Sequence, residues 1–452
     1  MRKFLFSCLP VLLMLSSLVS CEAKELKPDR PIVIELEVTP GRQDSILADA
    51  GGVSYAMMDA ALTFRASLRG TQNYRSGVYV YDSKSVNTYI NEPEKLAARI
   101  ALLGIKDVYL SASKGAIDGS DAIKRTWTRN FNKAAHQYGL VVWALRLASY
   151  AAFASDAIIN EECARILAYN NSVAFDERFD AVSADWEPHV LKENGADTPA
   201  GLNYFWDSST NYGIGGANDM LLKRTLDMLS LAKQNLNGLP VNEAIHYMYQ
   251  NNFDTGQLSY GSTLQFLNQC SYVTVMCYTD TKEKVWSRGL SPVENAQSKN
   301  KSVSICIKTS LNTYGDGGNA STSLHPKGWT YLIEALNYFY TQGASKPAFR
   351  GIDFFEFEGL EIMWQSVKTV TKTEIPDISD IKVAFDNVSG WLMFPNHEGN
   401  YRVEVFSANG ESVMSETFNN TGKIQTSHLA TGTYIVRITD ASGLFKTLKF
   451  AK

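Results

Sequence analysis

The chain has 452 residues, which is too long for one small core and suits one large domain with additional parts. Hydrophobic residues make up 45% and charged residues 20%, as in a soluble globular protein. The formal net charge is −4, so bulk charge argues against a nucleic-acid partner.

The N-terminus predicts an export signal. A basic start precedes an apolar run over residues 4–15, which is too short to span a bilayer. Residues 18–21, Leu-Val-Ser-Cys, resemble the bacterial lipobox, and an ordinary cleavage site with a chance cysteine is the alternative. We therefore expect residues 1–20 to be a lipoprotein signal peptide and Cys21 to carry the lipid. The membrane partner would be the outer membrane, at the cell surface or in the periplasm.

The remaining cysteines show no paired metal-ligand spacing; they are Cys163, Cys270, Cys277 and Cys306. An exported protein can form disulfides, but buried free thiols are the favoured interpretation. We expect neither a metal nor a cofactor.

Short β-rich runs alternate with helical stretches over residues 76–372. Residues 21–75 before them are expected to be a linker or an extra layer, with one strand at 31–40. Eight strands are predicted at 76–82, 105–112, 140–148, 179–188, 241–249, 271–280, 302–310 and 350–358. Eight such units over about 290 residues predict an α/β fold, a (β/α)8 TIM barrel of typical size. A doubly wound open sheet is the competing topology.

The pattern changes after residue 372. Residues 374–380 form a linker, and residues 378–452 carry short alternating runs with hairpin signals such as Asn409-Gly410. They predict a small all-β, immunoglobulin-like sandwich. Residues 429–450 resemble the C-terminal sorting-type domains of exported Bacteroidetes proteins, some of which direct type IX secretion. A purely structural appendage is the alternative.

The strand at 179–188, F-D-A-V-S-A-D-W-E-P, carries two carboxylates at its end, where TIM barrels build their active sites. Alternation places Ser183, Asp185 and Glu187 on one face. Neighbouring carboxylates raise one another's pKa, which suits the general acid of glycoside hydrolysis. We expect Glu187, nearer the rim, to be this acid and Asp185 to be its partner.

Two alternatives concern how this pair is used. Ion pairs with Lys308 or Arg146 would make the carboxylates structural. If they are catalytic, the absence of a carboxylate from 302–310 favours a mechanism in which the substrate's 2-acetamido carbonyl is the nucleophile. Asp185 would then stabilise the oxazolinium, and Tyr278, at the end of 271–280, would hold the acetamido oxygen.

The same stretch resembles the D-x-x-D-x-D-x-E signature of glycoside hydrolase family 18, the chitinases and endo-β-N-acetylglucosaminidases. M-C-Y at 276–278 resembles the family's Met-x-Tyr. The resemblance implies a TIM barrel with Glu187 as general acid and Tyr278 on the acetamido group. Ser183 stands where the family has its innermost Asp, which helps the middle Asp to switch position. Serine keeps a hydrogen bond without the charge, which is expected to lower the pKa of Asp185.

Further candidates for substrate binding accompany the catalytic ones: Tyr81, Trp143, Ser183, Met276, Asp280 and Glu356. Glu356 would be needed if a protein nucleophile were used. The family's sugar-stacking Trp on the last strand is not evident, and Phe355, Phe357 or Trp364 are its possible replacements.

The leading hypothesis is an exported glycosidase that cleaves N-acetylglucosamine-containing oligosaccharides or polysaccharides by substrate-assisted retaining hydrolysis. The first alternative is a non-catalytic carbohydrate-binding surface lipoprotein on a barrel of the same kind. The second is an adhesin or scaffold whose working part is the β-sandwich.

Overall fold

The structure is a computed structural model that describes two parts of the chain. The first comprises residues 46, 49–69, 74–207, 216–310 and 320–367, and the second 384–386, 390–394, 400–407, 411–419, 422–440 and 445–452. The expected signal peptide, Cys21, the strand at 31–40 and the linker at 374–380 lie outside the described residues. The chain divides into two compact units between Asp377 and Ile378, and each is described by itself.

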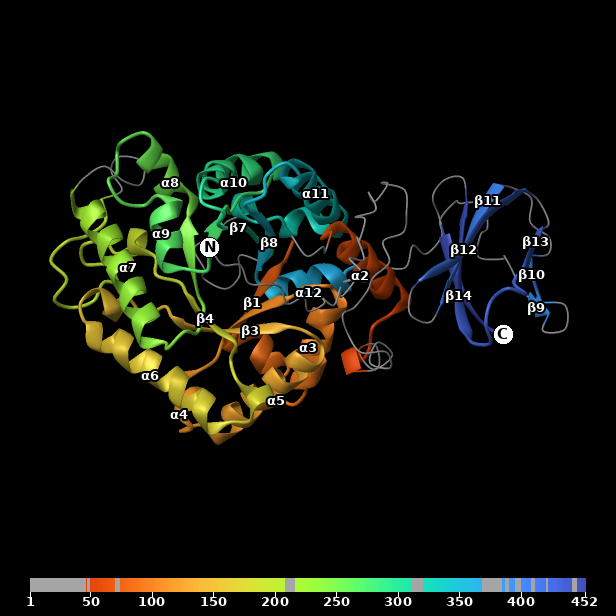
Figure 1. Ribbon diagram of the computed structural model, residues 1–452, viewed down its shortest axis with the longest axis horizontal. Coiled ribbons are helices and arrows are strands. Elements are labelled where there is room, and N and C mark those ends of the chain that lie inside the picture. Colours follow the sequence, from red (N-terminus) through yellow and green to blue (C-terminus); the bar gives the residue numbers. More distant parts are fainter. Residues whose placement is uncertain are drawn as a thin grey trace, which may run out of the picture. The chain divides into compact units, whose positions relative to one another are not determined.

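The first unit is a closed barrel of eight parallel strands with helices around it (Figure 1). The strands are β1 (Gly77–Tyr81), β2 (Asp107–Ser111), β3 (Val141–Leu147), β4 (Ala181–Ala184), β5 (Val241–His246), β6 (Tyr272–Met276), β7 (Val303–Lys308) and β8 (Phe349–Phe355). They pair in chain order, and β8 returns to β1. The predicted TIM barrel is confirmed.

The strand ends differ from the prediction in a way that matters for the site. β4 ends at Ala184 and β6 at Met276, so the acidic pair and Tyr278 lie just beyond the strands. Tyr249, expected in the fifth strand, belongs to helix α8 (Tyr247–Asp254).

The helices fill the ring around the barrel. They are α2 (Tyr55–Ser67), α3 (Pro93–Leu102), α4 (Lys114–Asp118), α5 (Ala122–Gln137), α6 (Asp156–Ser172), α7 (Gly216–Asn235), α8, α9 (Thr263–Gln269), α10 (Lys282–Gln297), α11 (Gly328–Gly343) and α12 (Phe357–Gln365). Polar caps begin several of them: Asp121 accepts a hydrogen bond from the Lys124 N–H, and Ser113 one from the Ala116 N–H.

Helix α2 was not predicted, and it packs within this ring. Phe64 stacks on Trp329 of α11 with ring centroids 5.1 Å apart. The indole N–H of Trp364 in α12 donates to the Met57 carbonyl at 2.6 Å. Residues preceding the first strand therefore contribute to the barrel's outer layer.

The barrel interior is filled rather than hollow. Tyr79, Tyr109, Trp143 and Tyr272 pack together inside it. Below them, buried Asp107 forms two ion pairs. Its Oδ1 lies 3.0 Å from Arg75 Nη2, and its Oδ2 lies 2.7 Å from Arg350 Nη2. Because this plug closes the lower lumen, the groups placed to meet a ligand are those at the carboxyl ends of the strands.

The second unit is all-β, as predicted (Figure 1). One antiparallel sheet has the order β13 (Gly422–Gln425), β10 (Trp391–Phe394), β9 (Ala384–Asp386). The other has the order β12 (Ser412–Asn419), β11 (Asn400–Ser407), β14 (Thr433–Asp440), β15 (Phe445–Ala451). Leu392 and Ile424 of the first sheet share a core with Val403, Val405 and Val436 of the second.

Two further observations bear on the sequence analysis. The four cysteines of the barrel are buried and free, as expected. Among the described residues, no helix has the length and apolar character needed to cross a membrane.

Candidate active site

The acidic pair lies where the chain leaves β4. The Asp185 N–H still donates to the Leu147 carbonyl of β3 at 2.9 Å, so the backbone stays extended for one residue beyond the strand. Asp185 therefore faces the lumen, as Ser183 does. Trp186 turns into the layer between sheet and helices, where it is 2% exposed, and Glu187 follows at the mouth. Trp186 is therefore a packing residue, as expected for the side of the strand opposite Asp185.

The pKa values of the two carboxyl groups are raised by different amounts. Burial raises the pKa of Asp185 to about 6. Burial and the charge of Asp185 together raise the pKa of Glu187 to about 8, although a hydrogen bond from the Tyr150 hydroxyl at 3.4 Å opposes the rise. At neutral pH, Glu187 therefore holds a proton while Asp185 is largely charged. Ser183 in place of the motif's aspartate was expected to lower the pKa of Asp185. That pKa is nevertheless above its ordinary value, because burial raises it.

No lysine or arginine among the described residues forms an ion pair with either carboxylate. A register shift in β3 accompanies an outward turn of Arg146, which pairs instead with Glu162 of α6 at 3.0 Å. His189 Nε2 lies 3.8 Å from Glu187 Oε1, but burial lowers the pKa of His189 to about 4, so the ring is neutral at pH 7. In the described part of the chain, neither of the expected ion pairs, with Lys308 or with Arg146, is formed by the two carboxylates.

Three aromatic side chains gather at the mouth. The Phe355 ring at the end of β8 lies 5.7 Å from that of Tyr81 and 5.5 Å from that of Tyr278. Burial, and then Cys306, Tyr79 and Asp185, raise the pKa of Tyr278 well above its ordinary value, so its hydroxyl remains a donor. Burial followed by the charges of Asp185 and Glu187 does the same for Tyr81.

Phe355 thus lies where the strand-eight tryptophan was expected. The other two candidates, Phe357 and Trp364, are fully buried in the helical layer.

Several predicted binding residues lie away from the mouth. Trp143 is 5% exposed and donates its indole N–H to Asp107 at 3.0 Å, deep in the lumen. The expectation that it stacks on a sugar is wrong, because interior side chains cover it. Ser183 is fully buried and Met276 nearly so. Asp280 lies at the rim, 3.9 Å from Lys327.

Glu356 begins α12 and is fully buried, with Lys84 Nζ at 3.3 Å from its carboxylate. Burial raises the pKa of Glu356, and Lys84 opposes the rise. An ion-paired carboxylate held in this way is poorly suited to act as a nucleophile.

The sequence analysis missed Glu243 of β5. This carboxyl is fully buried, accepts the Trp186 N–H at 3.1 Å, and has a second oxygen without a partner. Burial and then the charge of Asp185 raise its pKa well above the ordinary value, which favours the protonated form. A signal was present, since a glutamate between Val241 and Ile245 falls on an otherwise apolar strand face.

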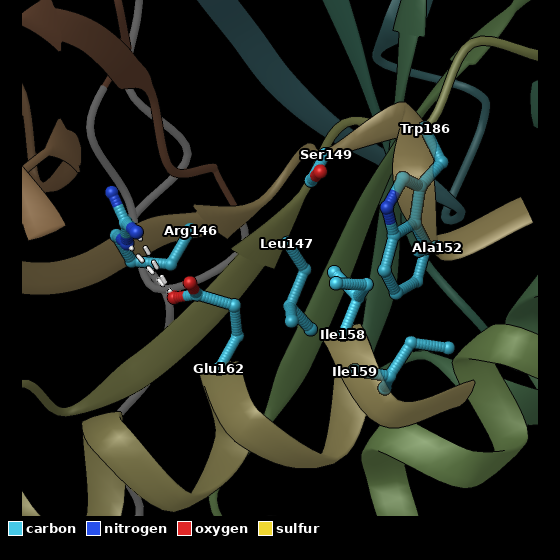
Figure 2. Close-up of a pocket in the computed structure, with 8 residues that line it drawn as sticks. All are labelled: Arg146, Leu147, Ser149, Ala152, Ile158, Ile159, Glu162 and Trp186. Carbon is cyan, nitrogen blue, oxygen red and sulfur yellow. Dashed lines mark hydrogen bonds and ion pairs between the residues drawn. The ribbon is translucent and has the colours of Figure 1, made fainter. Parts of the chain in front are cut away.

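A space of about 150 Å³ lies beside Trp186, between the ends of β3 and β4 and helix α6 (Figure 2). It is lined by Arg146, Leu147, Ser149, Ala152, Ile158, Ile159, Glu162 and Trp186. Its lining is mostly apolar and includes neither acidic residue of the pair, so it is a packing defect beside the site rather than the site itself.

Residues 376–451 match a family model described as the secretion system C-terminal sorting domain. The match confirms the sorting-type resemblance of the second unit and indicates an exported protein. No curated protein matches the chain.

Several solved structures are similar to the chain. One is a GH18 chitinase from Pseudoalteromonas aurantia, with 13% identity and TM-score 0.41 over 65% of this chain and 98% of that chain. An endo-β-N-acetylglucosaminidase from Cordyceps militaris has 10% identity and TM-score 0.35 over 68% and 95%. A β-mannanase from the blue mussel Mytilus edulis has 12% identity and TM-score 0.38 over 66% and 92%. At these identities and TM-scores, the similarities carry no argument about substrate or mechanism.

The raised pKa of Asp185 predicts a pH-dependent stability gain for Asp185→Asn. The unfolded carboxyl has a pKa of roughly 3.9, below its folded value, so its charge destabilises the folded state as pH rises. The variant should match wild type near pH 4 and exceed its free energy of unfolding by on the order of 2 kcal/mol at pH 8. Chemical denaturation at both pH values measures this.

Asp227→Asn is the control, because Asp227 is an exposed helical residue paired with Lys223. It should show no such gain on raising the pH. Loss of stability in Asp185→Asn at pH 8 would mean that the carboxylate has a stabilising partner.

Proposed function

We propose that the protein is a glycosidase that cleaves glycans next to N-acetylglucosamine by substrate-assisted, retaining hydrolysis. The observation that carries the proposal is the placement of two adjacent carboxyls at the carboxyl end of β4, where burial raises the pKa of both and that of Glu187 further. A general acid must hold its proton at working pH, and an electrostatic partner must be charged. Glu187 and Asp185 meet these two requirements. The acetamido group of the substrate takes the place of a protein nucleophile.

In the first step, the protonated carboxyl of Glu187 donates to the glycosidic oxygen as the bond to the anomeric carbon breaks. The carbonyl oxygen of the 2-acetamido group attacks that carbon from the opposite face and forms the oxazolinium ion. The charged Asp185 stabilises the positive charge on the acetamido nitrogen, and the Tyr278 hydroxyl donates to the acetamido oxygen and orients it.

In the second step, Glu187, now a carboxylate, accepts a proton from water. The water attacks the anomeric carbon, the acetamido oxygen leaves, and the product keeps the original anomeric configuration. The aromatic surface of Tyr81 and Phe355 is suited to pack against the sugar ring that carries the acetamido group.

Export is supported by the match of residues 376–451 to a sorting domain. We further propose that Cys21 is lipidated and that the enzyme acts at the outer membrane, where it meets extracellular or periplasmic glycans. Mass spectrometry of the mature N-terminus tests this part separately.

Glu187→Gln is expected to lower kcat on natural N-acetylglucosamine glycans by about 10²–10⁴-fold, because the amide cannot donate the required proton. An aryl glycoside, whose phenolate leaves without protonation, should lose much less. Reducing-end release and product masses are measured for both substrates. Glu283→Gln, an exposed substitution on α10, is the matched control.

Full activity of Glu187→Gln would overturn the assignment of the acid. Saturable binding of chito-oligosaccharide by wild type without any product would instead favour the non-catalytic binding protein, for which Ser183 in the motif is the specific argument.

The substrate-assisted mechanism also predicts that the acetamido group is indispensable. A matched oligosaccharide with a 2-hydroxyl at the cleaved residue should be hydrolysed at least about 10³-fold more slowly, because the nucleophile is missing. Proton NMR of the first product formed should show retention for the acetamido substrate. Comparable rates, or inversion, would require a water or protein nucleophile.

A further inference from the structure

Ser183 departs from the motif, and the structure joins it to a buried hydrogen-bond chain across the lumen. Ser183 Oγ lies 2.9 Å from Asn242 Oδ1 of β5, and Asn242 Nδ2 lies 3.1 Å from Thr274 Oγ1 of β6. Thr274 Oγ1 lies 2.8 Å from Asp353 Oδ2 of β8. All four residues are fully buried, and we call them the lumen chain.

The direction of every hydrogen bond in the lumen chain follows from Asp353, the residue at the end opposite Ser183. Asp353 also receives the Gly77 N–H and the Tyr109 hydroxyl, each at 2.8 Å, so its carboxylate is the acceptor. Thr274 has one hydroxyl proton and donates it to Asp353, so its oxygen must accept from the amide group of Asn242. The Asn242 carbonyl then faces Ser183, and the Ser183 hydroxyl must donate to it.

This direction decides what Ser183 can offer Asp185. The two residues lie on the same face with Cα atoms about 6–7 Å apart, so their side chains are within reach of one another. Because the Ser183 proton is used on Asn242, only an oxygen lone pair is available on the side of Asp185. A lone pair can accept from a protonated carboxyl, but it cannot stabilise a charged one.

We infer that Asn242, Thr274 and Asp353 are positioning residues. Their hydrogen bonds keep the Ser183 hydroxyl donating to Asn242, so the charged Asp185 carboxylate turns toward the substrate's acetamido group. The inference rests on the proposed function. The serine does not replace the charge of the motif's innermost aspartate. It leaves the charged Asp185 without a donor below, so the acetamido N–H becomes its best partner.

Other titratable groups lie near Asp185 and near Asp353. Those that face Asp185 are Tyr79, Tyr81, Tyr150, Glu187, Glu243, Tyr278 and Cys306. None of these seven can carry a positive charge. Lys308 of β7 lies near the same mouth, with its Nζ 5.9 Å from the Phe355 ring centroid, and among the described residues it forms no ion pair with Asp185. Asp353 faces Arg350, Asp107, Tyr109, Tyr272, Tyr340, Tyr79 and Cys306. Burial raises its pKa, and Arg350 with the hydrogen bonds from Tyr109 and Thr274 opposes the rise.

The test compares wild type with Ser183→Ala, Asn242→Leu and the double variant. Two readouts follow the midpoint of Asp185: the acid limb of kcat/KM, and carboxyl ¹³C NMR of the full chain assigned with Asp185→Asn. Ser183→Ala should leave the midpoint in place or lower it slightly, because it removes at most an acceptor for the protonated carboxyl. Asn242→Leu removes the acceptor, so the Ser183 hydroxyl turns to Asp185 and the midpoint should fall by about one pH unit. The double variant should restore it.

An upward shift in Ser183→Ala would overturn the inference, because it would mean that the serine already donates to Asp185. An unchanged midpoint in a folded Asn242→Leu variant would also overturn it. If Asn242→Leu does not fold, Ser183→Ala decides alone, since it removes a single hydroxyl. Expected NMR shifts in a protein without turnover would overturn the proposed function and leave the positioning chain standing.

Discussion

The candidate site depends on one constraint, the placement of two adjacent, partly buried carboxyls at the barrel mouth without an ion-paired lysine or arginine among the described residues. The two groups follow the same strand at the mouth of a barrel whose interior is already filled. At a separation of about 6 Å and an effective dielectric constant of about 20, two such charges repel by about 3 kcal/mol, roughly two pKa units. Repulsion of this size would raise the pKa of one carboxyl from about 4.5 to about 6.5, which alone does not keep it protonated at pH 7. Burial is the larger cause of the raised pKa of Glu187, the residue nearer the rim.

The neighbouring residues strengthen this constraint instead of relieving it. Arg146 is drawn away by Glu162 of α6, and the nearest imidazole, His189, is neutral because it is buried. Glu243 holds the Trp186 peptide from behind, and its own raised pKa favours its protonated form. The lumen chain adds a further restriction below Asp185, since its hydrogen bonds all point away from that carboxylate. Under the proposed mechanism, a cationic intermediate is the partner that this arrangement offers to Asp185.

The sequence predicted the parts that depend on local periodicity. The alternation of strand and helix identified all eight strands, and the period of two placed Asp185 inward and Trp186 outward. Trp143 was misplaced because alternation gives the face of a residue but not its depth in the barrel. Helix α2 was missed although residues 57, 60, 61, 64 and 68 are buried at helical spacing, because alanines dilute the apolar pattern. Glu243 left a signal as a carboxyl on an apolar strand face, but its contact with Trp186 and the lumen chain could not be found, since these contacts join strands that are distant in sequence.

The pH dependence of kcat/KM on an N-acetylglucosamine oligosaccharide tests the central claim most directly, because it reports the free enzyme's essential acid and base. Activity should rise as Asp185 loses its proton, near its pKa of about 6, and fall as Glu187 loses its own, near about 8. In Asp185→Asn the acid limb should disappear, and the alkaline limb should move to lower pH because the charge that raises the pKa of Glu187 is gone. A single limb in the ordinary carboxyl range, with activity constant through alkaline pH, would contradict the account.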